Sequence, residues 1–255
     1  MTLRYRQLAA DLRDRIAAGE YPPGARLPAI DTIAHDQGMS RDTVHTAIRL
    51  LEAQGIVQAV HGSGVVVLDQ RPVQVALSRY ASVMRPGGDL GPWETACQQT
   101  GITGRMHLIE VETVSADDEV TTALELLPAG RRIVRRSRHA VVDDPEQVVQ
   151  LHTASYPAKL VRGTPIARDA RIDGGVYGAF VAAGIIPATA TETVGARPAT
   201  DEEIAELRLR GQLTVLTVQR VTRDTGGRPI EYLQIAADPA RTVLKYDDLP
   251  LQPPA

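Results

Sequence analysis

The stretch 40–51 carries polar and cationic side chains at the spacing of a helix. One side of the expected helix holds Arg41, Thr43, His45, Thr46 and Arg49. The other side is apolar and holds Val44, Ala47, Ile48 and Leu51. Ser40 can cap the free amides of the first turn, and Gly55 can end the helix. The pattern predicts a recognition helix whose polar side is free to meet the phosphates and base edges of double-stranded DNA.

Arg136 and Arg138 are a second pair of candidates for binding. Both stand in an expected strand, 133–142, where alternation places their guanidinium groups on one face beside apolar neighbours. Two cations in such surroundings are costly unless they are paired, and a ligand's carboxylate or phosphate would satisfy them through bidentate bonds. Glu192 or Glu231 could instead neutralise them internally, as a structural ion pair.

Other polar side chains in the same half are weaker candidates. Hydroxyl groups for a ligand are offered by Ser155, Tyr156, Tyr177 and Tyr232. A tyrosine on a strand is as often part of the core or the surface. His107, His139 and Cys97 show no metal-ligand spacing, so we expect neither a metal ion nor a cofactor.

The recognition helix needs supporting elements, and the flanking sequence provides them. We expect a first helix from Leu3 to Ala18, a Pro/Gly-rich turn over 21–28 and a second helix from about Asp31 to Gln37. Two β-rich runs, 56–60 and 65–68, joined by His61-Gly62-Ser63-Gly64, predict a hairpin that would form a wing. The alternative is an ordinary three-helix domain with a hairpin.

The rest of the chain alternates strands with helices, which indicates a second domain of mixed α/β character. The expected strands are 106–114, 133–142, 148–155, 190–197, 214–223 and 229–237. The expected helices are 119–126, 177–183 and 201–207. The Pro/Gly-rich segment 69–92 is typical of a linker, with a short ordered piece around 76–84, and Trp93 is expected to pack in the core.

Composition and charge limit the functional classes. The chain has 255 residues and a net charge of −3, which excludes a generally basic, sequence-blind coat for nucleic acid. Its start lacks the apolar run of a signal peptide, and no apolar run approaches ~18 residues, so we expect a cytoplasmic protein with no membrane partner. Residues 1–70 hold seven arginines and eight acids, so this DNA-binding head, as we call the segment, has no excess of basic side chains. We therefore expect a homodimer that places two heads on a palindromic operator.

The first seventy residues resemble the GntR family of bacterial transcription regulators. The resemblance rests on Ser40 followed by Arg41-Asp42-Thr43-Val44, on Pro22-Pro23-Gly24 with Leu27-Pro28, and on Gly62-Ser63-Gly64. It implies that Arg41, His61 and Gly62 contact DNA and that Ser40 and Thr43 support phosphate contacts. Arg4, Arg26, His45 and Arg49 complete the expected DNA-binding set.

Two positions depart from the GntR pattern. Ala29-Ile30-Asp31 stands where the family usually has a Ser-Glu-Arg run that caps the second helix. Losing such a cap typically costs ~1 kcal/mol, although Asp31 could move the cap inward. His45 replaces the family's second recognition-helix arginine, so base preference is expected to differ.

The second half resembles the UTRA ligand-sensing domain of the HutC branch, whose fold is like chorismate lyase. The matching motifs are Arg136-Ser137-Arg138, Ser155-Tyr156-Pro157, Gly174-Gly175-Val176-Tyr177, Glu192 followed by Arg197, and Gly227-Arg228-Pro229-Ile230-Glu231-Tyr232. The resemblance implies that the effector lies at Arg136 and Arg138 and therefore favours a small, anionic molecule. His152 stands where related sensors often have an acidic residue. The expected effector set is Arg136, Arg138, His152, Ser155, Tyr156, Tyr177, Glu192, Glu231 and Tyr232.

Taken together, these patterns predict an α+β protein with three parts. Residues 1–68 would form a winged helix-turn-helix, 69–92 a linker, and 93–250 a UTRA domain for effector binding and dimerisation. The expected function is a ligand-responsive regulator, most simply a repressor. Two alternatives stay open: a DNA-binding head fused to a lyase-like enzyme, and a DNA-binding protein that senses nothing. Against the enzyme, the sequence shows no Ser/His/Asp arrangement, phosphate loop or acid–base pair.

Overall fold

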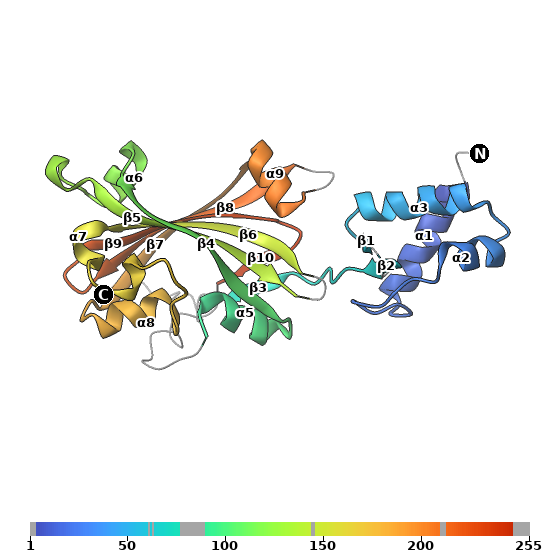
Figure 1. Cartoon of the computed structure of the whole chain (residues 1–255), viewed down its shortest axis with the longest axis horizontal. Coiled ribbons are helices and arrows are strands. Elements are labelled where there is room, and N and C mark those ends of the chain that lie inside the picture. The colour runs from blue at the N-terminus through green and yellow to red at the C-terminus, as the bar shows by residue number, and fades with distance from the viewer. Residues whose placement is uncertain are drawn as a thin grey trace, which may run out of the picture. The chain divides into compact units, whose positions relative to one another are not determined.

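The fold was obtained as a computed structural model (Figure 1). It describes residues 4–60, 62, 64–76, 90–143, 146–209 and 213–246. The chain divides into two compact units, of which the first is formed by Met1–Arg71 with Leu209–Leu213 and the second by Pro72–Arg208 with Thr214–Ala255. The predicted ordered piece at 76–84 lies almost wholly outside the described residues.

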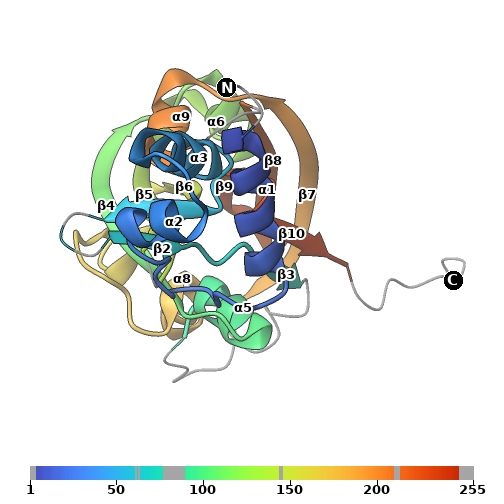
Figure 2. The same ribbon diagram turned by 90° about the vertical axis from the view of Figure 1, so that its right-hand side faces the viewer.

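The first unit contains the three helices and the β-hairpin that were predicted (Figures 1 and 2). Its elements are α1 (Arg4–Ala17), α2 (Ile30–Asp36), α3 (Arg41–Ala53), β1 (Val57–Val60) and β2 (Gly64–Val67). Leu12, Val44 and Leu51 are almost fully buried where the three helices and the hairpin meet. Gly55 has φ 71°, and the amides of Gly55 and Ile56 close the end of α3.

The start of α2 differs from the expectation. The helix begins at Ile30, and Ala29 occupies the N-cap without a side-chain hydrogen bond. Asp31 therefore lies inside the first turn, and the inward shift of the cap that it could have provided does not occur. Its carboxylate instead pairs with Arg41, at 2.8 Å from the Nε atom.

A six-stranded antiparallel sheet forms the centre of the second unit, in the order β4-β5-β6-β9-β8-β7. The strands are β4 (Gly104–Ser115), β5 (Arg132–Val142), β6 (Gln147–Pro157), β7 (Pro187–Pro198), β8 (Thr214–Asp224) and β9 (Pro229–Ala237). All six were predicted, with ends shifted by a few residues. The α+β fold class is thereby confirmed.

Helices cover both faces of this sheet (Figure 1). One face carries α5 (Pro92–Thr100), α7 (Ala158–Val161) and α8 (Gly175–Ala182), and the other carries α6 (Asp118–Ala123) and α9 (Asp201–Leu207). Two 3₁₀ turns, Pro128–Gly130 and Pro165–Ala167, complete the described helical segments. Trp93, the second residue of α5, packs in the core with 3% of its surface exposed, and its indole donates to the carbonyl of Val141 at 3.0 Å.

A small two-stranded sheet occupies part of the segment that was predicted as a linker. Strand β3 (Val73–Ala76) pairs in parallel with β10 (Thr242–Lys245), with Val73 opposite Thr242. Each strand is only four residues long, too short for a periodic signal, so no pattern in the sequence predicted this pair. β3 is therefore the first element of the second unit, directly after the DNA-binding candidates.

No helix in the described part of the chain combines the length and apolar character needed to cross a membrane.

Candidate functional site

The polar side of α3 is exposed, as the sequence predicted. Arg41, His45 and Arg49 are all exposed, whereas Val44 and Ala47 on the opposite side are fully buried. The three exposed side chains can thus reach a partner without disturbing the core. That they contact DNA stays a prediction.

Ser40 is the N-cap of α3. Its hydroxyl accepts a hydrogen bond from the amide of Thr43 at 3.3 Å and lies 2.8 Å from the hydroxyl of Thr43. These bonds fix the first turn of the helix, whose unpaired amides form a natural contact for a phosphate. Thr46 donates to the carbonyl of Asp42 at 2.8 Å, so its hydroxyl bonds to the helix itself.

The segment 24–27 forms backbone hydrogen bonds with strand β2 of the hairpin. The amides of Gly24 and Leu27 donate to the carbonyls of Val67 and Val65, and Arg26 bridges to Val66. Arg26 is exposed beside the hairpin, and Arg4 is exposed at the start of α1.

At the tip of the hairpin, Gly62 has φ 75° and Gly64 φ 80°, backbone conformations that favour glycine. His61, a predicted DNA contact, and Ser63 lie outside the described residues.

Asp31 holds the guanidinium that we expect to read DNA. The Arg41–Asp31 pair is two-thirds exposed on both sides, and exposed pairs contribute about 0.2–1 kcal/mol. Replacing Asp31 by asparagine should therefore tighten operator binding about two- to fivefold at low salt, because Arg41 is released and a charge that repels phosphate is removed. Fluorescence anisotropy with an operator duplex would measure the change.

Asp36→Asn is the matched control, since Asp36 is exposed on the same helix and lies beside His35 rather than an arginine. In an Arg41→Ala background the Asp31 effect should shrink. Weaker binding by Asp31→Asn would show instead that Asp31 orients Arg41 for its contact.

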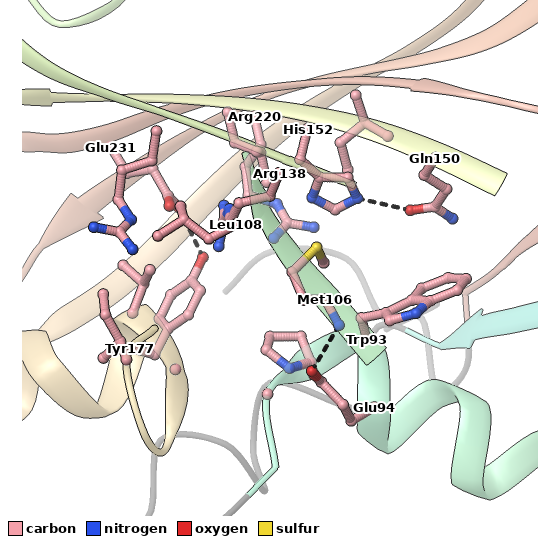
Figure 3. Close-up of a pocket in the computed structure, with 18 of the residues that line it drawn as sticks. Trp93, Glu94, Met106, Leu108, Arg138, Gln150, His152, Tyr177, Arg220 and Glu231 are labelled. Carbon is pink, nitrogen blue, oxygen red and sulfur yellow. Dashed lines mark hydrogen bonds between the residues drawn. The ribbon is translucent and has the colours of Figure 1, made fainter. Parts of the chain in front are cut away.

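The second unit contains a cavity between the sheet and two helix starts (Figure 3). Its volume is about 120 Å³; a single water needs ~10–15 Å³ on this scale, so a ligand of several heavy atoms fits. The lining residues are Val75, Gly91, Pro92, Trp93, Glu94, Met106, Leu108, Arg136, Arg138, Gln150, His152, Arg171, Ile172, Gly175, Val176, Tyr177, Arg220, Glu231, Leu233 and Ile235.

Strand register brings the polar lining residues together. Arg138 lies opposite His152 across β5 and β6, and His152 lies opposite Ile235 across β6 and β9. Arg136 lies opposite Ala154, whose small side chain leaves room above the sheet. The prediction that the two arginines share one face is confirmed.

Arg136 is held by the protein itself. It is 2% exposed, and its two terminal nitrogens donate to the carbonyls of Ile166, Arg168 and Ala170 at 2.7–2.9 Å. Burial lowers the pKa of its guanidinium. Its Nε is buried without a hydrogen-bond partner among the described residues. Arg136 thus clamps the segment before α8 and keeps one donor unused.

Arg138 has no such partners. Its Nε is buried and unpaired, and no hydrogen bond or ion pair of its side chain exists within the described part of the chain. The predicted internal alternative is wrong for this structure, because neither Glu192 nor Glu231 forms an ion pair with Arg136 or Arg138 where the chain is described. Glu192 pairs with Arg220, its direct neighbour across β7 and β8.

Glu231 lies in the cavity wall with three hydroxyl groups around it. It accepts from Tyr156 at 2.9 Å, Tyr177 at 3.2 Å and Thr222 at 3.1 Å. Burial raises the pKa of both tyrosines well above the ordinary value, and the charge of Glu231 raises it further. Both phenols therefore keep their protons and donate to the carboxylate.

His152 begins a chain of hydrogen bonds that leaves the cavity. Its Nε2 lies 2.8 Å from Oε1 of Gln150, and the amide nitrogen of Gln150 donates to the hydroxyl of Thr242 at 3.1 Å. Thr242 belongs to β10, which pairs with β3. The carbonyl of Arg241 accepts from the amide of Val73 at 2.9 Å, next to the same strand pair.

Four predicted effector residues do not line the cavity. Tyr156 contributes its hydroxyl to Glu231 from behind the wall, and Glu192 contributes its carboxylate to Arg220. Ser155 and Tyr232 belong to the opposite face of the sheet. Side chains alternate along a strand, and their sequence neighbours Tyr156 and Glu231 point to the cavity side. Tyr232 donates there to Glu119 at 2.6 Å.

Sequence reasoning missed Arg220, Arg171, Gln150 and Glu94 as lining residues. Gln150 carried a usable signal, since strand alternation gives it the same side of the sheet as the predicted residue His152. Arg220 carried none, because no predicted site residue lies on its strand. Arg171 and Glu94 come from segments whose position depends on tertiary packing. Within the described residues, no group of three or more His, Cys, Asp or Glu side chains is arranged to hold a metal ion.

Comparison with known proteins places both units in recognised families. Residues 4–67 match the family described as bacterial regulatory proteins, gntR family, and residues 99–240 match the UTRA domain. An uncharacterized HTH-type transcriptional regulator of Streptomyces coelicolor is 30% identical over 235 residues, which cover 90% of this chain and 86% of the relative.

Two further similarities agree with this assignment. The mannosyl-D-glycerate transport/metabolism system repressor MngR of Escherichia coli is 29% identical over 127 residues, covering 50% of this chain and 48% of the relative. A crystal structure described as a GntR-family transcriptional regulator is 28% identical with a TM-score of 0.59, and the match covers 98% of both chains. These relatives are regulators, which sets aside the enzyme alternative. This chain belongs to the gntR family of bacterial regulatory proteins, and it is a ligand-responsive, DNA-binding transcription regulator with a UTRA effector domain.

Proposed function

We propose that the protein is a dimeric, cytoplasmic repressor that releases a palindromic operator when a small anionic molecule enters the cavity of the UTRA domain. The observation that carries the proposal is Arg138, a guanidinium that lines the cavity and has no partner within the described residues. A carboxylate or phosphate is the group that satisfies such a donor set best. Arg136 adds its unpaired Nε beside it.

The head supports the operator part of this proposal. Arg41, His45 and Arg49 are exposed on the one polar side of α3, and Ser40 fixes the helix start. Because residues 1–70 have no excess of basic side chains, one head offers few phosphate contacts. Two heads on two half-sites would combine two modest affinities, which favours a dimer. The repressor role is that of MngR, a repressor that resembles about half of this chain.

Communication with the head would run through β3. Val75 of β3 lines the cavity, and the hydrogen-bond chain from His152 through Gln150 reaches Thr242 of the partner strand β10. A ligand that moves His152 would disturb this chain. β3 follows the first unit directly in the sequence, so a shift of β3 would move the point at which the DNA-binding head is attached. The coupling needed for a ligand to change operator affinity is typically 1–3 kcal/mol.

Thr242→Val is expected to weaken this coupling. Valine keeps the shape and the strand pairing but removes the hydroxyl that Gln150 contacts. We expect effector and operator affinities measured separately to stay within about twofold, whereas the effector-induced change in operator affinity falls at least threefold. Anisotropy titrations with and without effector provide the measurement.

Thr113→Val on β4 is the control, because its side chain is exposed and makes no hydrogen bond within the described residues. Full coupling in Thr242→Val would rule out this route.

The proposed function is tested by capturing genomic fragments with the purified protein and titrating the enriched site against anionic metabolites and sugars. A palindromic site released by an anionic compound is the expected result. Release only by a neutral compound would overturn the anionic assignment. Enrichment without any responsive compound would leave a constitutive DNA-binding protein.

A further inference from the structure

Charged groups of both signs line the cavity without being paired to one another. Arg220 is neutralised by Glu192, which lies outside the lining. Among the described residues, Arg136, Arg138 and Arg171 form no ion pair with an acid, and Glu94 and Glu231 form none with a base. Three unpaired cations therefore face two unpaired carboxylates, which leaves an excess of one positive charge.

Arg138 and the start of α8 both offer donors to an anion in the cavity. The N-cap of α8 is Gly174, which provides no side-chain hydrogen bond, and Gly175, Val176 and Tyr177 of the first turn line the cavity. The amide of Gly175 donates to the carbonyl of Ile172 at 3.0 Å, so it is not one of the amides offered to a ligand. Backbone amides at a helix start attract anions. The unused Nε of buried Arg136 lies in the same wall.

The negative end is formed by Glu231, which is only 2% exposed. A carboxylate can accept about four hydrogen bonds, and three are taken by the hydroxyls of Tyr156, Tyr177 and Thr222. One position stays open, and the three neutral donors leave the negative charge without a cation. Figure 3 shows Glu231 and Tyr177 together at one end of the cavity, with Glu94 at another part of the wall.

We propose that the effector is a small zwitterion with a net charge of −1. Its acidic groups would carry two negative charges, and it would have one protonated amine. The anionic part would bind Arg138 and the amides of α8, and the amine would bind Glu231. Two classes share this chemistry, the amino dicarboxylates and the aminoalkyl phosphates. The proposal rests on the proposed function, because it names the ligand of the same cavity.

The physical reason is the cost of burying a charge that stays unpaired. A dianion without an amine would satisfy Arg138 but leave Glu231 buried, charged and close to the incoming negative groups. A zwitterion pairs both ends and cancels the excess positive charge of the lining. Charge complementarity of this kind acts chiefly on selectivity, so it should appear as discrimination between closely matched ligands.

Two matched pairs of compounds provide the test, with binding measured by calorimetry on the full chain. L-aspartate is compared with succinate, and 2-aminoethyl phosphate with ethyl phosphate. In the unmodified protein we expect the amine-bearing member of at least one pair to bind tenfold or more tightly than its partner. The pair that shows this preference distinguishes the dicarboxylate class from the phosphate class.

Glu231→Gln should abolish the preference for the amine while leaving the weaker partner's affinity unchanged or improved. Glu119→Gln is the matched control, because Glu119 also accepts three hydrogen bonds, from Tyr232, Gln219 and Gln234, but on the opposite face of the sheet. It should retain the preference. Arg138→Met should remove binding of all four compounds.

Equal or tighter binding of succinate and ethyl phosphate would overturn the zwitterion assignment, as would a preference that survives in Glu231→Gln. Operator release by an anion without an amine, with none of the four compounds binding, would overturn it while leaving the sensing function intact. If no compound binds and none releases the operator, both this inference and the proposed function fail.

Discussion

Arg41→Ala is expected to weaken operator binding by about 1–3 kcal/mol for each half-site if its guanidinium reads a base. Arg41 is the first residue of α3, and its side chain is two-thirds exposed with one exposed ion-pair partner, Asp31. The variant should also lose preference at one operator position in each half-site. Anisotropy titrations at fixed salt against operators substituted one base pair at a time would show both effects.

Arg13→Ala separates this effect from the loss of a charge. Arg13 is exposed on α1, and its replacement by alanine removes one positive charge from the same unit, as Arg41→Ala does. It should reduce affinity only slightly and equally for every operator. If Arg41→Ala also lowers affinity uniformly over all sequences and reduces the salt dependence by about one contact, Arg41 is a phosphate contact and does not read sequence.

Secondary structure was largely predictable because each long element carries its own periodic signal. The apolar residues of α3 recur at helical spacing, and the hairpin turn at 224–227 follows from its Asp-Thr-Gly-Gly sequence. β3 and β10 escaped prediction, since they pair with each other across about 170 residues of chain and neither is long enough to show a period. The bulge between Leu108 and Glu110 was equally invisible, although it shifts the alternation of side chains along β4 beyond Leu108.

The cavity was predictable only where strand alternation applied. Alternation correctly placed Arg136 and Arg138 on one face, but it could not show that Arg136 is occupied by three carbonyls and Arg138 by none. Ser155 and Tyr232 were drawn from motifs, and strict alternation from His152 and Glu231 would have removed both. Partners such as Arg220 for Glu192 depend on strand order, which a single sequence does not reveal.

Arg136→Met is expected to lower the free energy of unfolding of the second unit by about 3 kcal/mol or more. Methionine fills much of the space but leaves the carbonyls of Ile166, Arg168 and Ala170 without their donor. The bond to Ile166 is buried and the other two are partly buried, and a buried unsatisfied acceptor costs ~1–3 kcal/mol. Urea unfolding followed by tryptophan fluorescence would measure the loss, because the chain's single tryptophan, Trp93, is buried in this unit.

Arg138→Met is the decisive comparison, because the two arginines stand on the same face of one strand and differ in their hydrogen-bond partners. Arg138 makes no hydrogen bond within the described residues, so its replacement should change the free energy of unfolding by less than about 1 kcal/mol while abolishing anion binding. Equal stability of both variants, with equal loss of anion binding, would show that Arg136 also serves the ligand directly. A large stability loss in Arg136→Met alone would show that Arg136 maintains the structure of the cavity and that Arg138 binds the anion.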